Sequence, residues 1–212
     1  MKKILLILAI VTLMVNYNKA QDNKTDFRER LQFGAKIGTN YSNVYDTKGE
    51  EFSADGKFGF AFGGFVSIPI GKFIGIQPEV LYSQKGFQAT GKILGLNYKF
   101  TRTLSYIDVP ILFTMKPTEF ISLLIGPQYS YLVKSKEVFA TAITTIEQEQ
   151  EFENDNIRKN TLCFLFGADI NLKNIVLSGR AGWDLLNNIG DGSSTTPRYK
   201  NVWYQATIGF RL

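Results

Sequence analysis

The residues most often used for catalysis are scarce in this chain, whereas charged residues recur at alternate positions within apolar segments. None of the 212 residues is histidine, which excludes Ser-His-Asp and Cys-His catalysis and metal sites built on imidazole. The chain contains no Walker or Gly-x-Gly-x-x-Gly phosphate-binding motif. We therefore expect no enzymatic activity, no cofactor and no metal site.

The alternating charges are the main candidates for a functional cluster. Six of them share a predicted strand face with small residues: Lys36, Glu79, Asp169, Arg180, Asp184 and Arg211. Asp108 joins this face if a bulge lies between Arg102 and Tyr106. Because isolated charges in a confined interior are costly, we expect them to pair across the lumen of a closed structure. A plugged, salt-bridged interior is the simpler interpretation, and a gated pore is the functional alternative.

Two other features could carry chemistry. Cys163, the single cysteine, falls on the same predicted face, and we expect a small, buried and inert residue there. The acidic run EQEQEFENDN at 147–156 could bind a cation or a basic partner, although a solvated loop explains it more simply.

The elements that would position these residues are β-strands, and the last one shows the pattern most clearly. One of its faces consists of Val202, Tyr204, Ala206, Ile208, Phe210 and Leu212. The other consists of Trp203, Gln205, Thr207, Gly209 and Arg211. A two-residue period predicts a strand. We expect its apolar face to contact lipid and its backbone to pair with residues 31–42, which would close a barrel.

Seven further segments alternate in the same way. The predicted strands cover 31–42, 58–70, 74–83, 96–115, 121–131, 162–172, 175–185 and 202–212. Long connections at 43–57, 84–95, 133–160 and 186–200 alternate with turns of a few residues. The sequence VFATAITTIE within the third connection could extend its hairpin as a β-ribbon, and Pro78 predicts a local bulge. The pattern predicts an all-β, eight-stranded antiparallel up-and-down transmembrane barrel.

The amino-terminal segment indicates export. MKK, an apolar run and a polar stretch ending at Ala20 are typical of a secretory signal peptide, so we expect a signal peptide at 1–20, a periplasmic tail at 21–30 and the barrel domain at 31–212. Loss of Lys2, Lys3 and Lys19 lowers the formal net charge from +5 to +2, which argues against nucleic-acid binding. Short turns would lie in the periplasm with both termini, and long loops outside a Gram-negative cell.

A soluble lipocalin-like barrel would alternate as well, but its outer face would be rich in charged and polar residues. Here the less apolar face is dominated by glycine and serine, which suit the crowded interior of a narrow barrel. Several aromatic residues fall near the predicted outer ends of the apolar faces, as in an interfacial girdle. They are Tyr41, Tyr82, Tyr98, Tyr129, Tyr131 and Trp183.

Five sequence blocks resemble the PorT-like outer-membrane β-barrel family of the Bacteroidetes. They are GAKIGTNYSNV, FGGFVSIPIGKFIGIQPEVLYSQKG, LSYIDVPILFTMKP, LLIGPQYSYLV and the terminal IGFRL. The resemblance covers nearly the whole mature chain and implies an eight-stranded barrel in the outer membrane. The chain departs from the common insertion signal at Leu212, which replaces a final aromatic residue.

Three functions are compatible with the sequence. The first is a structural or binding barrel whose four extracellular loops serve adhesion, envelope integrity or association with a secretion complex. The second is a narrow channel for small solutes or ions, and the third is a soluble ligand carrier. The expected partners are outer-membrane lipid, the barrel-assembly machinery during biogenesis, and a protein or envelope partner bound through the loops.

Overall fold

The computed structural model describes residues 26–46, 54–93, 96–141, 144–150, 158–188 and 199–212. The predicted signal peptide lies outside the described residues, as does most of the acidic run. A short 3-10 helix, η2 (Phe27–Glu29), precedes the strands. The strands are β1 (Gln32–Asp46), β2 (Asp55–Pro69), β3 (Ile74–Ile93), β4 (Leu96–Met115), β5 (Ile121–Thr141), β6 (Thr145–Gln150), β7 (Asn160–Leu172), β8 (Ile175–Asp184) and β9 (Tyr199–Arg211).

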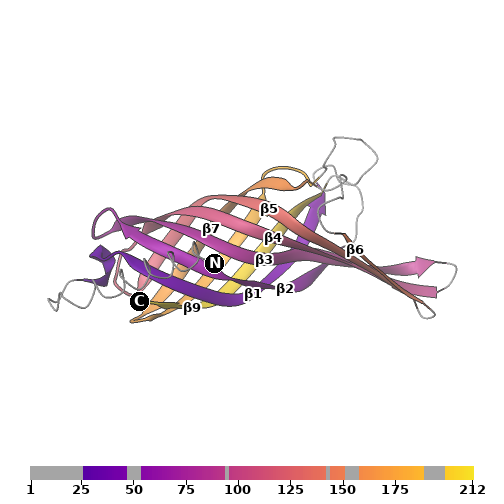
Figure 1. Ribbon diagram of the computed structural model, residues 1–212, viewed down its shortest axis with the longest axis horizontal. Helices are drawn as coiled ribbons and strands as arrows, with labels where there is room; N and C mark the ends of the chain where they lie inside the picture. Colours follow the sequence, from indigo (N-terminus) through magenta and orange to yellow (C-terminus); the bar gives the residue numbers. More distant parts are fainter. Residues whose placement is uncertain (1–25, 47–53, 94–95, 142–143, 151–157, 189–198) are drawn as a thin grey trace, which may run out of the picture.

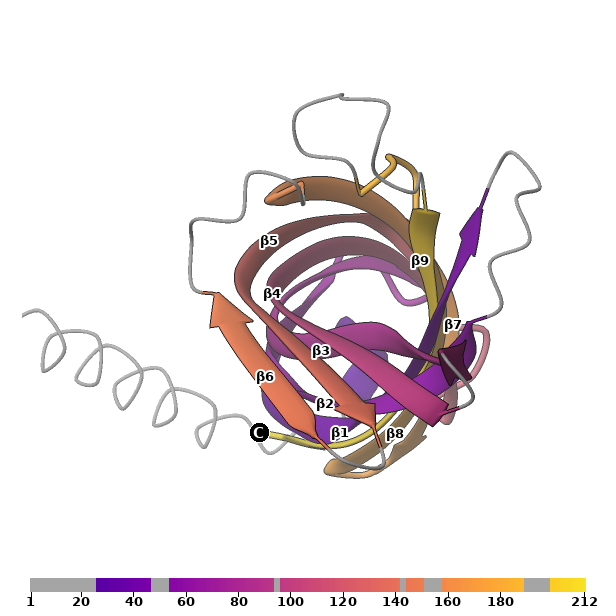
Figure 2. The same cartoon turned by 90° about the vertical axis from the view of Figure 1, so that its right-hand side faces the viewer.

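Eight antiparallel strands close into a ring, which confirms the predicted up-and-down barrel (Figure 2). The closure joins β1 to β9, with Ile37 opposite Ile208 and Lys36 opposite Gly209. Strand β6 lies outside the ring and pairs with β5. Because every strand of the ring has two neighbours, the ring has no open edge.

Apolar side chains point outward and polar side chains point inward. On the outer face, Ile37, Phe60 and Phe210 are 61%, 70% and 55% exposed. On the inner face, Glu79, Asp108 and Arg180 are at most 5% exposed. This is the reverse of a soluble carrier, in which the apolar face lines a cavity. In the described part of the chain, no helix is long and apolar enough to cross a membrane.

Glycines allow the strands to coil tightly around the narrow interior. A Cβ atom on Gly38 would lie 2.0 Å from the carbonyl oxygen of Ala206 on β9. A Cβ atom on Gly63 would lie 2.0 Å from the carbonyl oxygen of Val80 on β3. Such distances are collisions, so a side chain at either position would push two paired strands apart.

The prediction of a loop at residues 84–95 is wrong for residues 84–93, and residues 94 and 95 lie outside the described part of the chain. Strand β3 continues to Ile93 and β4 begins at Leu96, with continuous pairing from Gln84 opposite Ser105 to Ile93 opposite Leu96. A polar sequence with glycines can form a strand here because residues of the neighbouring strand pack against the glycines. Gly91, for example, lies beneath the ring of Tyr98, which a Cβ atom would approach to 2.5 Å. Tyr98 therefore lies beyond the barrel wall and not in the predicted girdle.

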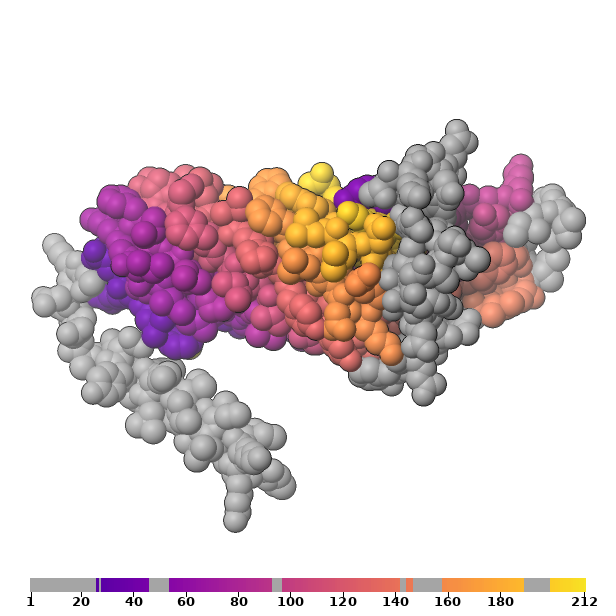
Figure 3. Space-filling view, turned by 90° about the horizontal axis from the view of Figure 1, so that it is seen from above, coloured from indigo at the N-terminus to yellow at the C-terminus, as the bar shows by residue number. Residues whose placement is uncertain are grey.

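Strand β5 also runs past the wall, and it pairs with β6 as the predicted ribbon. We call residues 84–93, 96–105, 132–141 and 145–150 the ribbon. It projects from one end of the barrel in Figure 1, and its magenta and orange tip lies at the right of Figure 3. The ribbon therefore lies on the same side of the barrel as the longer connections. Where the sequence predicted a loop, its strands are paired through their backbones.

Two predictions about bulges need correction. The register of β3 is the same on both sides of Pro78, so no residue is inserted there, although the pairs with β2 are interrupted beside it. The register of the β4–β5 pair shifts between Ser105 and Tyr106, within the predicted interval. Val133 on β5 has no partner on β4, so the extra residue lies in β5. The alternation of inward and outward side chains along β4 is therefore uninterrupted.

Candidate functional site in the barrel interior

Four of the predicted lumen charges meet in one cluster. The Lys36 ammonium lies 2.7 Å from each carboxylate oxygen of Glu79. The Arg180 guanidinium lies 3.2 Å from Glu79 and 2.7 Å from Asp169. The amide of Gln77 donates a further hydrogen bond of 2.8 Å to Glu79. Strands β1, β3, β7 and β8 therefore meet through side chains that cross the lumen.

The cluster balances its charges. Two cations and two anions are buried together, each at most 5% exposed. A buried ion pair gains little net stability over apolar packing, but loss of one member leaves an uncompensated charge in a medium of low dielectric constant. The arrangement is therefore suited to holding the strands in a fixed register.

A second ion pair lies where the ribbon joins the barrel, and it includes Lys85, which is not among the predicted lumen charges. The Lys85 ammonium lies 3.1 Å from Asp108 and sits over the rings of Trp203 and Tyr106, 3.8 and 4.9 Å from their centroids. Lys85 is excluded from the predicted lumen face by the predicted loop at residues 84–95. Its signal was present in the sequence, since Gln77, Glu79, Leu81, Ser83 and Lys85 continue one alternation.

Asp184 is buried among neutral donors and belongs to neither ion pair. Its carboxylate accepts hydrogen bonds of 3.0 and 2.6 Å from the backbone and side-chain amides of Asn201, and one of 3.0 Å from Asn188. The Cys163 thiol donates to it over 3.1 Å and is fully buried. This corner of the lumen is consequently a buried, hydrogen-bonded lining.

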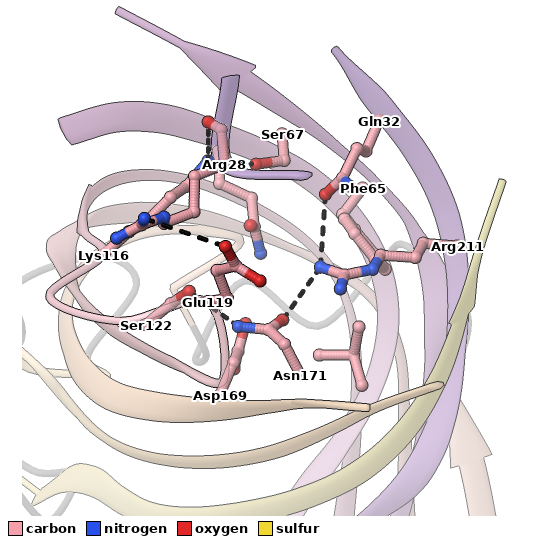
Figure 4. A pocket seen from close by; sticks show the side chains of 12 residues that line it. Arg28, Gln32, Phe65, Ser67, Lys116, Glu119, Ser122, Asp169, Asn171 and Arg211 are labelled. Atoms are coloured by element: carbon pink, nitrogen blue, oxygen red, sulfur yellow. Dashed lines mark hydrogen bonds and ion pairs between the residues drawn. The ribbon is translucent and has the colours of Figure 1, made fainter. Parts of the chain in front are cut away.

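Arg211 lies at the end of the barrel opposite the ribbon, where it lines the same small cavity as Asp169 of the four-residue cluster. Its guanidinium donates to the side-chain oxygens of Gln32 and Asn171, over 3.2 and 3.0 Å (Figure 4). It also donates to the backbone carbonyl of Lys173 over 2.7 Å. Its position ties the carboxyl-terminal strand to the neighbouring turn and to β1.

Residues before β1 cross this end of the barrel. The buried Lys116 ammonium donates to the backbone carbonyl of Arg28 and to the hydroxyl of Ser67, both over 3.3 Å. Arg28 pairs with Asp26, and this guanidinium holds the pKa of the Asp26 carboxyl far below its usual range. Burial lowers the pKa of the Lys116 ammonium. Segment 26–30 is thus held against the turns at this end of the barrel.

The cavity beneath this segment is small. It has a volume of about 20 Å³ and is lined by Arg28, Lys116, Glu119, Asp169 and Arg211, among others (Figure 4). Such a volume accommodates roughly one water molecule. Within the described residues, no cluster of three or more cysteine and acidic side chains is placed to hold a metal ion.

The closing strand presents its predicted apolar face to the outside of the barrel. Tyr204, Ile208, Phe210 and Leu212 are 64%, 52%, 55% and 66% exposed, respectively. Ala206 is also exposed and Val202 is half-buried. Between them, Gln205 donates a hydrogen bond of 2.9 Å to Asn40 within the lumen.

Comparison with known proteins identifies one family. The model of the family described as outer membrane protein beta-barrel domain matches residues 19–190. No curated protein sequence matches the chain.

Several solved structures are similar at low sequence identity. Ail, the attachment invasion locus protein of Yersinia pestis, is 14% identical, with 85% of this chain and 98% of that chain covered and a TM-score of 0.46. Neisserial surface protein A is 10% identical, with 84% of this chain and 96% of that chain covered and a TM-score of 0.45. OprG from Pseudomonas aeruginosa is 11% identical, with 87% of this chain and 97% of that chain covered and a TM-score of 0.40. Similarity at this level carries no information about ligands.

Proposed function

The chain belongs to the outer membrane protein beta-barrel domain family, and from this membership we propose that it is a rigid outer-membrane scaffold that presents its ribbon and extracellular loops to a binding partner. Adhesion, envelope integrity and association with a secretion complex are the roles that such a scaffold would serve. The barrel anchors the ribbon, and the ribbon supplies the contact surface.

The length of three neighbouring strands carries this proposal. Strands β3, β4 and β5 contain 20, 20 and 21 residues. A tilted transmembrane strand needs only about 9 to 11 residues. The excess continues as the paired ribbon, whose edge strand β6 has a neighbour only on its β5 side within the described residues. An ordered sheet beyond the wall is preorganised for binding, because little conformational entropy is lost on contact.

The filled lumen argues against the alternative of a narrow channel. The lumen contains two buried ion pairs, Lys36–Glu79 and Lys85–Asp108. The buried side chains of Trp203 and Leu112 also fill it. The described cavity near Lys116 has room for roughly one water molecule. The outward apolar face likewise argues against a soluble carrier, and the chain has no histidine to serve as the base of an enzymatic role.

The finer features of the family and topology are also proposals. The quoted sequence blocks support a PorT-like protein of the Bacteroidetes, exported by a signal peptide at 1–20 and inserted by the barrel-assembly machinery. Gly34 lies opposite Arg211, so both ends of the barrel domain are at the end with short turns, which supports periplasmic termini. In this orientation the ribbon is extracellular, and the outward face of β9 contacts lipid.

A shortened hairpin tests the scaffold proposal. Residues 89–100 would be replaced by Asn-Gly, which can close the hairpin after the pair Gln88 and Thr101. A photo-crosslinking residue would replace the exposed Thr145 on β6, with the exposed Thr118 on a turn at the opposite end as the matched control.

We expect crosslinked partner adducts in intact cells from position 145 and none from position 118. The shortened variant should lose the adducts while it keeps outer-membrane fractionation and heat-dependent gel mobility. Stable large channels in planar bilayers, with no adduct from position 145, would replace the scaffold with the channel interpretation.

A further inference from the structure

The outward face of the ribbon tip is polar and carries two exposed lysines, Lys92 and Lys99, and we propose that it binds the anionic saccharide head group of an outer-leaflet glycolipid. This inference rests on the proposed function, because it requires the ribbon to be extracellular. It adds a specific ligand class to a surface that would otherwise be only a site for protein contact.

The face is a direct continuation of the wall that contacts lipid. On β4 the alternating outward positions run from Ile111 and Ile107 to Thr103, and then to Lys99 and Asn97. Neighbouring β3 changes in the same order, from Val80 through Gln84 to Thr90 and Lys92. A molecule whose acyl chains lie against the barrel would therefore meet hydroxyl, amide and ammonium groups in succession without changing sides.

Two exposed lysines at the tip lack an acidic neighbour. Lys99 lies opposite Thr90 on β3 and Ala140 on β5, and Lys92 lies opposite Asn97. The lysines are thus diagonal neighbours on one face, about 7 to 8 Å apart. Among the described residues, no carboxylate lies within 4 Å of either ammonium. A bound phosphate or carboxylate between them would relieve their mutual repulsion.

The ribbon tip also provides space for a ligand. An open groove of about 590 Å³ is lined by Thr90, Lys92, Asn97, Lys99, Ala140 and Thr141. Ala140, opposite Lys99, has a short side chain that leaves the groove floor low. Thr90 and Asn97 offer a hydroxyl and an amide, which suit the hydroxyl groups of a sugar. Lys134 and Lys136, lower on this face, already interact with other residues of the chain.

The height of the lysine pair selects the kind of lipid. Lys99 is eight residues beyond Ile107, which corresponds to about 27 Å along the strand and, at a tilt of roughly 45°, to about 20 Å above the apolar wall. A phospholipid head group would not reach this level. A glycolipid with an anionic saccharide, such as lipopolysaccharide, would contact the wall with its acyl chains and the lysines with its head group.

The test uses the full chain in phospholipid nanodiscs, titrated with purified lipopolysaccharide. The Lys92→Gln/Lys99→Gln variant should bind about 10- to 30-fold more weakly, since each basic residue near an anionic surface adds about a factor of five. The Lys92→Arg/Lys99→Arg variant should retain binding. Lys173→Asn, an exposed substitution at the opposite end, should have no effect; asparagine tolerates the positive φ of this position.

Two modified ligands separate the possible sources of the anion. Dephosphorylated lipopolysaccharide should bind weakly, as should the saccharide released from its lipid. Equal binding of the released saccharide would assign the groove to a soluble polyanion, and unchanged binding by the Gln variant would overturn the site. Partner adducts from position 145 are measured independently, so either of these failures leaves the scaffold proposal standing, whereas absence of the chain from the outer membrane overturns both.

Discussion

Lys36 and Glu79 are separated by 43 residues in the chain, yet the Lys36 ammonium lies 2.7 Å from both carboxylate oxygens of Glu79 inside the barrel. Arg180, 101 residues beyond Glu79, approaches the same carboxylate. Glu79 therefore links three strands of the ring, β1, β3 and β8. Its surroundings predict how the barrel responds to loss of a single charge.

Glu79→Gln should destabilise the barrel by about 3 to 5 kcal/mol, because it leaves Lys36 buried without an anion. Urea unfolding in lipid vesicles, followed by tryptophan fluorescence, measures the change. The matched control is Glu119→Gln, since Glu119 is 52% exposed and its loss should cost less than about 1 kcal/mol. Adding Lys36→Met to Glu79→Gln should recover part of the stability, and a double variant less stable than Glu79→Gln would contradict the pairing.

Ile208→Arg should impair insertion or lower stability by about 2 to 4 kcal/mol, because Ile208 points outward near the middle of the apolar band. Leu212→Arg, at the end of the same face, should cost about 1 kcal/mol or less. Folding yield into vesicles and heat-dependent gel mobility report both effects. Normal assembly of the Ile208→Arg barrel would mean that this face does not contact lipid.

Gly38→Ala should destabilise the barrel by about 1 to 3 kcal/mol, because the added Cβ atom would collide with the backbone of β9. Gly179→Ala is a close control, since a Cβ atom on this outward glycine has no neighbour within 4 Å. Its effect should remain within about 0.5 kcal/mol. Comparable losses of stability in the two variants would point to a general cost of replacing glycine in the strands.

Cys163 should resist thiol reagents in the folded barrel, because its side chain is fully buried next to Asp184. Mass spectrometry after maleimide treatment should show modification only once the protein is unfolded. A Thr145→Cys substitution adds a thiol at an exposed ribbon position and should react at once in the folded state. Rapid labelling of Cys163 in the native barrel would reveal an opening of the lumen.

The local pattern was sufficient for the wall of the barrel. In a strand, successive side chains point to opposite faces, so the alternation from Val202 to Leu212 predicts both the element and its two faces. It also identified the inward side of Lys36, Glu79, Asp169 and Arg180. The alternation is weaker where both faces are polar, and for this reason residues 84–93 resembled a loop although backbone pairing with β4 makes them a strand.

The sequence by itself determined that eight strands would alternate, that apolar residues would occupy one face, and that charges would be enclosed on the other. Only the tertiary structure decided which charges meet. Lys85 pairs with Asp108, Asp184 is held by neutral donors, and Arg211 lies at the far end of the barrel. The reason is that contacts across the lumen depend on the register and stagger of strands distant in the chain, which a two-residue period within one strand does not encode.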